Sequence, residues 1–129
     1  MNIYLDIDGV LVSKYHEPVE GLKEFLERIT GVHDCYWLTT HCRDGKNERA
    51  VEQLEAVYGA GILESANKIK PTAWQTFKTE AIDFSQDFRW LDDYVMLYEE
   101  TILKKENAHS KLILINLQTN PKQLANLNL

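Results

Sequence analysis

The chain has 129 residues, of which 44% are hydrophobic and 26% are charged, the usage of one globular domain. Fourteen basic and twenty acidic side chains give a formal net charge of −6. This charge argues against a protein that coats nucleic acid by bulk positive charge, although a local basic groove could still bind it. The longest apolar runs, such as 112–115, are far shorter than the roughly 20 residues of a membrane span. Two cysteines make no disulfide framework, and acidic residues occupy the amino terminus where a signal peptide would be apolar. We therefore expect one cytoplasmic domain over residues 1–129, with no membrane partner.

Short apolar runs alternate with amphipathic ones along the whole chain, the pattern of βα units around a parallel sheet. The runs expected to form strands are, in order, 3–7, 35–39, 61–63, 88–91 and 112–115. The segments expected to form helices are 19–29, 47–58, 71–82 and 95–105, with one short helical segment near the carboxyl terminus. These elements predict an α/β fold, a three-layer α/β/α, Rossmann-like parallel sheet of about five strands.

Polar side chains lie at the carboxyl ends of three of these predicted strands. They are Asp6 and Asp8, then Thr39 and Thr40, then Asp92 and Asp93. Ligands of open parallel sheets bind beyond the carboxyl ends of the strands, so these residues predict a site at that edge. Aspartate also favours turns and helix caps, which is the structural alternative for any one of these positions.

Four carboxylates at one edge would repel one another unless a cation lay among them. Hard oxygen ligands of this kind suit Mg²⁺, which binds carboxylates together with substrate phosphate. A zinc site at Cys35, His41 and Cys42 is a poor alternative, because Cys35 would begin a buried strand. The sequence therefore predicts Mg²⁺ as the cofactor.

Residues 3–11, Ile-Tyr-Leu-Asp-Ile-Asp-Gly-Val-Leu, resemble the first motif of the haloacid dehalogenase superfamily of phosphohydrolases. Residues 37–39 resemble its second motif, Lys78 its third, and residues 90–93 its fourth. The motifs occur in the order of the family and span residues 3 to 93.

The resemblance implies that Asp6 is the nucleophile and that Asp8 is the general acid and base. The residue types agree with this, because a carboxylate can attack phosphorus and a second carboxyl can carry the proton. In a regular strand both side chains would also point to the same face.

The resemblance further implies that Thr39 hydrogen-bonds a phosphoryl oxygen and that Lys78 neutralises negative charge. Mg²⁺ would be held by Asp6, Asp92 and the backbone carbonyl of Asp8, with Asp93 as a ligand or an orienting group. Thr40 replaces Thr39 if the strand is one residue longer.

The sequence leaves the roles of other residues near these motifs undecided. Lys68 and Lys70 compete with Lys78 for the third motif. His41 and Arg43 either contact substrate or lie in a solvated loop.

The intervals 9–38 and 40–77 are occupied by predicted elements, so neither leaves room for the cap domain that many relatives carry. An uncovered site suits a phosphorylated macromolecule, such as a nucleic-acid end, or a homo-oligomer in which another subunit covers the site. Residues 37–39 also share a Trp-x-Thr pattern with the phosphatase parts of polynucleotide-repair enzymes. We therefore expect a phosphoester hydrolase without a cap domain.

Two other functions fit parts of the pattern. A receiver-like phosphoacceptor module uses acids, a threonine and a lysine around Mg²⁺, but its acidic pair ends the first strand, whereas here the pair comes late. A catalytically silent domain retained for binding is the second alternative, although every motif position holds a competent residue.

Overall fold

A computed structural model describes residues 1–129 as four parallel strands with helices around them. The strands are β1 (Asn2–Leu5), β2 (Asp34–Trp37), β3 (Phe88–Asp92) and β4 (Leu112–Leu114), in the spatial order β2-β1-β3-β4. The helices are α1 (Leu22–Val32), α2 (Glu48–Tyr58), α3 (Leu63–Ala66), α4 (Leu97–Lys105) and α5 (Gln123–Asn126). Three 3₁₀ helices complete the elements, η1 (Ala60–Ile62), η2 (Lys78–Ala81) and η3 (His109–Lys111). None of the helices combines the length and apolar character needed to cross a membrane.

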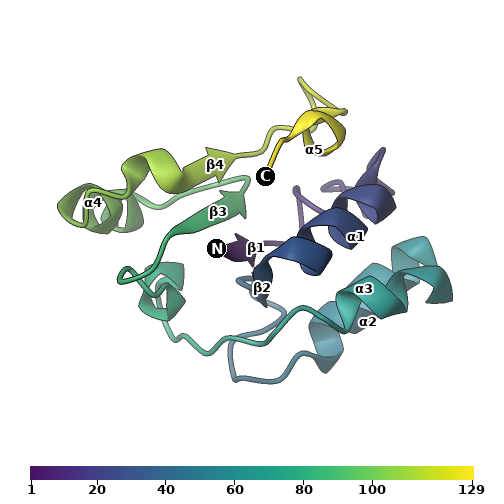
Figure 1. Ribbon diagram of the computed structural model, residues 1–129, viewed down its shortest axis with the longest axis horizontal. Coiled ribbons are helices and arrows are strands. Elements are labelled where there is room, and N and C mark those ends of the chain that lie inside the picture. The colour runs from purple at the N-terminus through teal and green to yellow at the C-terminus, as the bar shows by residue number, and fades with distance from the viewer.

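Each face of the sheet carries its own apolar core. Ile3 and Leu5 point to one face and pack with the helices α1, α2, α3 and α5. Tyr4 points to the other face, where it packs with Trp90 and with Leu103 of α4. Figure 1 shows these two groups of helices on opposite sides of the strands. The alternation of side chains along buried strands thus produces three layers, with the sheet in the middle.

The strand count is four, so the expectation of about five strands is wrong. Residues 61–63, predicted as a strand, belong to η1 and α3. The apolar run there is too short for periodicity to distinguish a strand from a buried helical turn. Ile62 and Ala66 are buried against α1 and α2, which explains why the run is apolar.

The helix predicted over 71–82 is also wrong, since only η2 forms within it. Residues 70–73 instead lie extended along β2, with the Lys70 N–H bonded to the Cys35 carbonyl and the Trp37 N–H bonded to the Lys70 carbonyl. The Thr72 hydroxyl also donates to the Trp37 carbonyl. These bonds satisfy the outer edge of β2, and this gain outweighs the helical propensity of the segment.

The register of the sheet brings the ends of β1 and β3 together. Leu5 lies beside Leu91, and the Asp6 N–H donates to the Leu91 carbonyl over 3.1 Å. Asp6 therefore leaves β1 next to Asp92, the last residue of β3. The two central strands place these acids side by side.

Candidate active site

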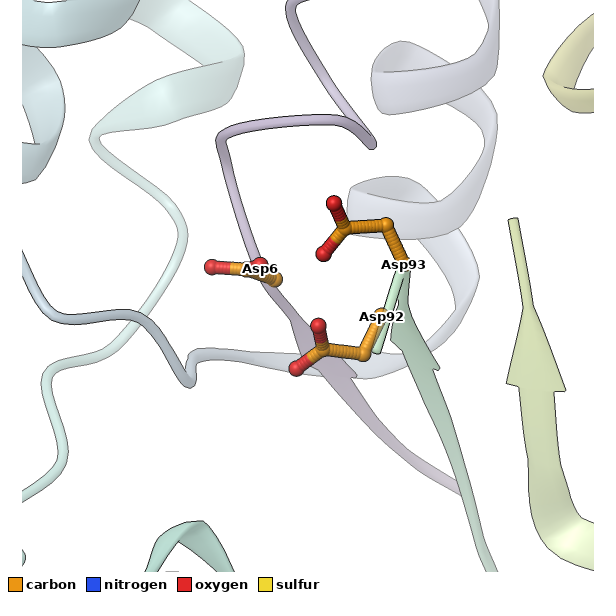
Figure 2. Close-up of side chains that lie close together, drawn as sticks. All are labelled: Asp6, Asp92 and Asp93. Atoms are coloured by element: carbon orange, nitrogen blue, oxygen red, sulfur yellow. The ribbon is translucent and has the colours of Figure 1, made fainter. Parts of the chain in front are cut away.

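Three carboxylates gather where β1 and β3 end. Asp6, Asp92 and Asp93 each offer an oxygen, and these oxygens all lie within 4.8 Å of one another. Figure 2 shows the three side chains around one common space at the ends of the two strands. Asp6 and Asp92 are 7% and 1% exposed, whereas Asp93 is exposed. Two of the three acids are thus fixed in the protein interior.

Lys78 supplies the positive charge next to this acidic group. Its Nζ lies 2.6 Å from Asp92 Oδ2 and 3.4 Å from Asp6 Oδ1, and its side chain is only 14% exposed. The chain arrives there through η2, where the Lys78 N–H donates to Glu99 Oε2 over 2.8 Å. Of the candidate lysines, the structure therefore brings Lys78 to the acids.

The other two lysines lie elsewhere. Lys70 pairs with Asp34 over 3.1 Å at the opposite end of β2. Lys68 is exposed and lies in a small surface hollow beside α1 and α3, away from the carboxylates.

The surroundings raise the pKa values of the clustered groups. Burial raises the pKa of Asp92 to about 6, and the charge of Asp6 acts in the same direction. Partial desolvation beside Asp92 likewise raises the pKa of the Asp93 carboxyl to about 6. Burial raises the pKa of Asp6 although Lys78 opposes it. For Lys78, burial alone would lower the pKa, but Asp6 and Asp92 together outweigh it and raise the pKa.

Asp8 stands apart from this group. The expectation of a strand over 3–7 is too long, because β1 ends at Leu5 and the chain turns after Ile7. The N–H groups of Val10, Leu11 and Val12 all bond to the Ile7 carbonyl. Asp8 is therefore not held on the same strand face as Asp6. Its Oδ2 lies 2.8 Å from His41 Nε2 instead.

Gly9 sits between the acidic group and this turn. Its φ of +80° lies in the left-handed region, which glycine adopts without strain. A Cβ at this position would overlap the Asp93 carboxylate. Gly9 thus allows the backbone to pass directly against Asp93.

The two threonines after β2 differ in exposure. Thr39 is fully buried, and its Oγ1 accepts from the His41 N–H over 3.3 Å. Thr40 is exposed and lines the cleft beside Asp6 and Lys78. Both remain candidates for the phosphate contact.

Two residues at the site have roles that their sequence pattern did not assign. Glu99, 3% exposed, accepts from the Met96 and Lys78 N–H groups and so ties the start of α4 to η2. Glu99 is the third residue of α4, a position where glutamate commonly caps a helix, and this pattern could have identified it from the sequence. Trp90, which begins the fourth motif, donates from Nε1 to Asp92 Oδ2 over 3.1 Å.

Two hollows flank the acidic group and share Asp93. One, of about 370 Å³, is lined by Asp6, Lys78, Asp92 and by Arg43, whose guanidinium lies 4.5 Å over the ring of buried Trp74. The other, of about 500 Å³, lies between the 13–15 loop and residues 114–118. Both provide space for a substrate next to the carboxylates.

The residues present fit a divalent cation. When ionised, Asp6, Asp92 and Asp93 carry three negative charges, of which Lys78 offsets one. Carboxylate oxygens are the ligand type that Mg²⁺ prefers. Asp8 Oδ1 is a buried oxygen without a hydrogen-bond partner, so this edge of the sheet has one more oxygen that can accept a hydrogen bond.

No family model, curated protein or solved structure matches the chain. Its function is therefore argued from the geometry of this site.

Proposed function

We propose that the chain is a Mg²⁺-dependent phosphoester hydrolase of the haloacid dehalogenase type, with a Rossmann-like, capless domain, that acts through an aspartyl-phosphate. The observation that carries the proposal is the buried Asp6 carboxylate, which lies 3.4 Å from the Lys78 amine and opens on a cleft that both residues line. A carboxylate in this position has a cation to offset its charge and space in front of it for a phosphoryl group.

In the first step, a carboxylate oxygen of Asp6 attacks phosphorus and the bond from phosphorus to the leaving oxygen breaks. Protonated Asp8 gives its proton to the leaving oxygen. The products of this step are an aspartyl-phosphate on Asp6 and a free alcohol.

In the second step, the Asp8 carboxylate takes a proton from water, whose oxygen attacks the same phosphorus. The bond from phosphorus to the Asp6 oxygen breaks, which returns Asp6 as a carboxylate and releases inorganic phosphate. Asp8 is again protonated, so the cycle closes with one water consumed.

Lys78 and a hydroxyl of Thr39 or Thr40 would bind the phosphoryl oxygens during both steps. Mg²⁺ held by Asp6, Asp92 and the Asp8 carbonyl, with Asp93 beside it, would offset the charge on the phosphoryl group.

The test is hydrolysis of nitrophenyl phosphate by purified protein with Mg²⁺ or with a chelator. We expect turnover with Mg²⁺ that is lost with the chelator and in the Asp6→Asn variant. Absence of turnover on every phosphoester tried would contradict the proposal. Stable labelling of Asp6 by acetyl phosphate without release would favour the phosphoacceptor module instead.

The substrate we propose is a phosphorylated macromolecule, such as a nucleic-acid end, or a smaller phosphate handled by a homo-oligomer whose subunits cover the site. Water-exposed sites stabilise developing charge poorly, so a bulky substrate or a second subunit would supply the missing cover. A panel of phosphorylated metabolites and oligonucleotides, combined with light scattering, tests this. A monomer with its highest kcat/KM on a small sugar phosphate would contradict it.

A further inference from the structure

We propose that His41 is the positioning residue for Asp8, fixing the orientation of the general acid through a hydrogen bond to Oδ2 of its carboxyl. This inference rests on the proposed function and concerns the same site. The geometry that supports it is the 2.8 Å contact between His41 Nε2 and Asp8 Oδ2.

Asp8 needs such a support because nothing else holds its carboxyl. It lies beyond the end of β1, and its side chain is 43% exposed, whereas that of Asp6 is 10% exposed. Its other oxygen, Oδ1, has no hydrogen-bond partner, and the nearest basic group is His16 Nδ1 at 3.9 Å. Without His41, the Asp8 carboxyl would have no hydrogen bond to a side chain.

His41 is itself well anchored. Its side chain is 19% exposed, and its N–H donates to Oγ1 of buried Thr39. The turn that carries it is closed by the Cys42 N–H bonded to the Thr39 carbonyl over 3.0 Å. Cys42 is fully buried, with its Sγ 3.5 Å from the Thr72 carbonyl. The imidazole is therefore fixed relative to the end of β2.

The contact sets the orientation of the Asp8 carboxyl. Oδ2 is engaged by the imidazole, which as the Nε2–H tautomer donates to the carboxylate. Oδ1 is buried and has no hydrogen-bond partner, so the hydrogen bond at Oδ2 is the polar contact that sets the direction of the carboxyl. Proton transfer requires this alignment, since general acid catalysis depends on hydrogen-bond reach to the leaving oxygen.

The test exploits the dependence of general acid catalysis on the leaving group. An alkyl leaving group needs a proton, whereas nitrophenolate leaves without one. We compare wild type, His41→Leu, His41→Gln and Asp8→Asn on an alkyl phosphate and on nitrophenyl phosphate, each with Mg²⁺. His16→Asn is the matched control, because His16 is a neighbouring histidine that lies beyond hydrogen-bond distance of Asp8.

We expect His41→Leu to lose about tenfold in kcat on the alkyl phosphate and less than about threefold on nitrophenyl phosphate, within the range that general acid catalysis provides. His41→Gln keeps an N–H donor on a side chain of similar reach, so it should recover much of the alkyl activity. His16→Asn should match wild type on both substrates. A role of His41 in folding alone would lower both activities equally and would not be rescued by glutamine.

Equal losses on both substrates, or no loss, in His41→Leu would overturn the inference. A selective defect in Asp8→Asn would at the same time keep the proposed function standing. Failure of wild type to turn over either substrate would overturn the proposed function as well. Circular dichroism checks that each variant is folded. If His41→Leu does not fold, His41→Asn, whose shorter side chain does not span to Asp8, takes its place in the comparison.

Discussion

Asp6 and Asp8, the two carboxylates that act in the proposed reaction, are held in opposite ways. Asp6 is buried at the end of a central strand, beside Asp92 and 3.4 Å from the Lys78 amine. Asp8 lies in a loop, is 43% exposed at its side chain, and is held by one contact with His41. The first region is stabilised by charge compensation inside the protein, and the second by a hydrogen bond near its surface. Substitutions in the first should therefore affect both activity and stability, and substitutions in the second mainly activity.

The largest effect should come from Asp6→Asn. The substitution removes the nucleophile with almost no change in volume, so turnover of nitrophenyl phosphate should fall by at least about 10³-fold while the fold persists. Steady-state kinetics and circular dichroism measure the two effects. Asp87→Asn is the control, because Asp87 pairs only with Arg89 and Lys111 away from the site. Residual activity near wild type in Asp6→Asn would exclude Asp6 as the nucleophile.

Next in size is the effect of Lys78→Met on stability. Removing the ammonium leaves two buried carboxylates unpaired, which should cost about 3–5 kcal/mol in the free energy of unfolding at neutral pH. Urea unfolding in a chelator measures it. Lys70→Met is the matched control and should change little, because the Lys70–Asp34 pair is exposed. A loss no larger than that of the control would show that Lys78 does not compensate the acids.

Binding of Mg²⁺ should stabilise the chain strongly at pH 7.5 and weakly at pH 4.5. Burial raises the pKa values of Asp92 and Asp93 from 3.8 to about 6 in the folded chain. Without metal, protonation of these carboxyls therefore stabilises the folded state. That stabilisation is fully present below about pH 4 and is lost as the pH rises through 6. Metal and protons therefore compete for the same oxygens.

At a hundredfold excess over Kd, Mg²⁺ at pH 7.5 adds about 2.7 kcal/mol, which thermal melts detect as a rise in Tm. In Asp92→Asn this rise should disappear. An equal rise in Tm at both pH values would show that the cation binds elsewhere.

The smallest effects should separate Thr39 from Thr40. Thr39→Val leaves the His41 N–H without its acceptor and should cost about 1 kcal/mol in stability, with a selective loss on the alkyl phosphate. Thr40→Val should leave stability unchanged and raise KM, because Thr40 lines the cleft. Unfolding curves and kinetics on the two variants measure both. The opposite pattern would assign the phosphate contact to Thr39.

Much of the sheet was predictable from sequence because its strands are buried apolar runs. Four of the five predicted strands form, and the prediction of acids at the ends of the first and fourth is confirmed for Asp6 and Asp92. The prediction of a strand over 61–63 was wrong because the run has only three residues, too few to show a strand or helix period. The prediction of a helix over 71–82 was wrong because the conformation of this segment depends on hydrogen bonds to β2, which the local sequence pattern does not indicate.

The same distinction holds within the site. Asp6, Asp8 and Lys78 were predicted as site residues because they lie in segments that resemble the motifs of a phosphohydrolase family. The partnership of Asp8 with His41 joins residues 33 positions apart through a turn that only the tertiary structure defines. Its members were visible in the sequence, but their contact was not.

The segment along the outer edge of β2 has a consequence for the behaviour of the chain in crowded solution. Exposed strand edges recruit strands of other molecules and thereby start aggregation. Lys70 and Thr72 bond to the Cys35 carbonyl and to the N–H and carbonyl of Trp37 at the β2 edge, so these backbone groups are not available to a neighbouring copy. The remaining edge belongs to β4, which is only 3 residues long. The stretch that breaks the expected helix thus protects the sheet from pairing with other sheets.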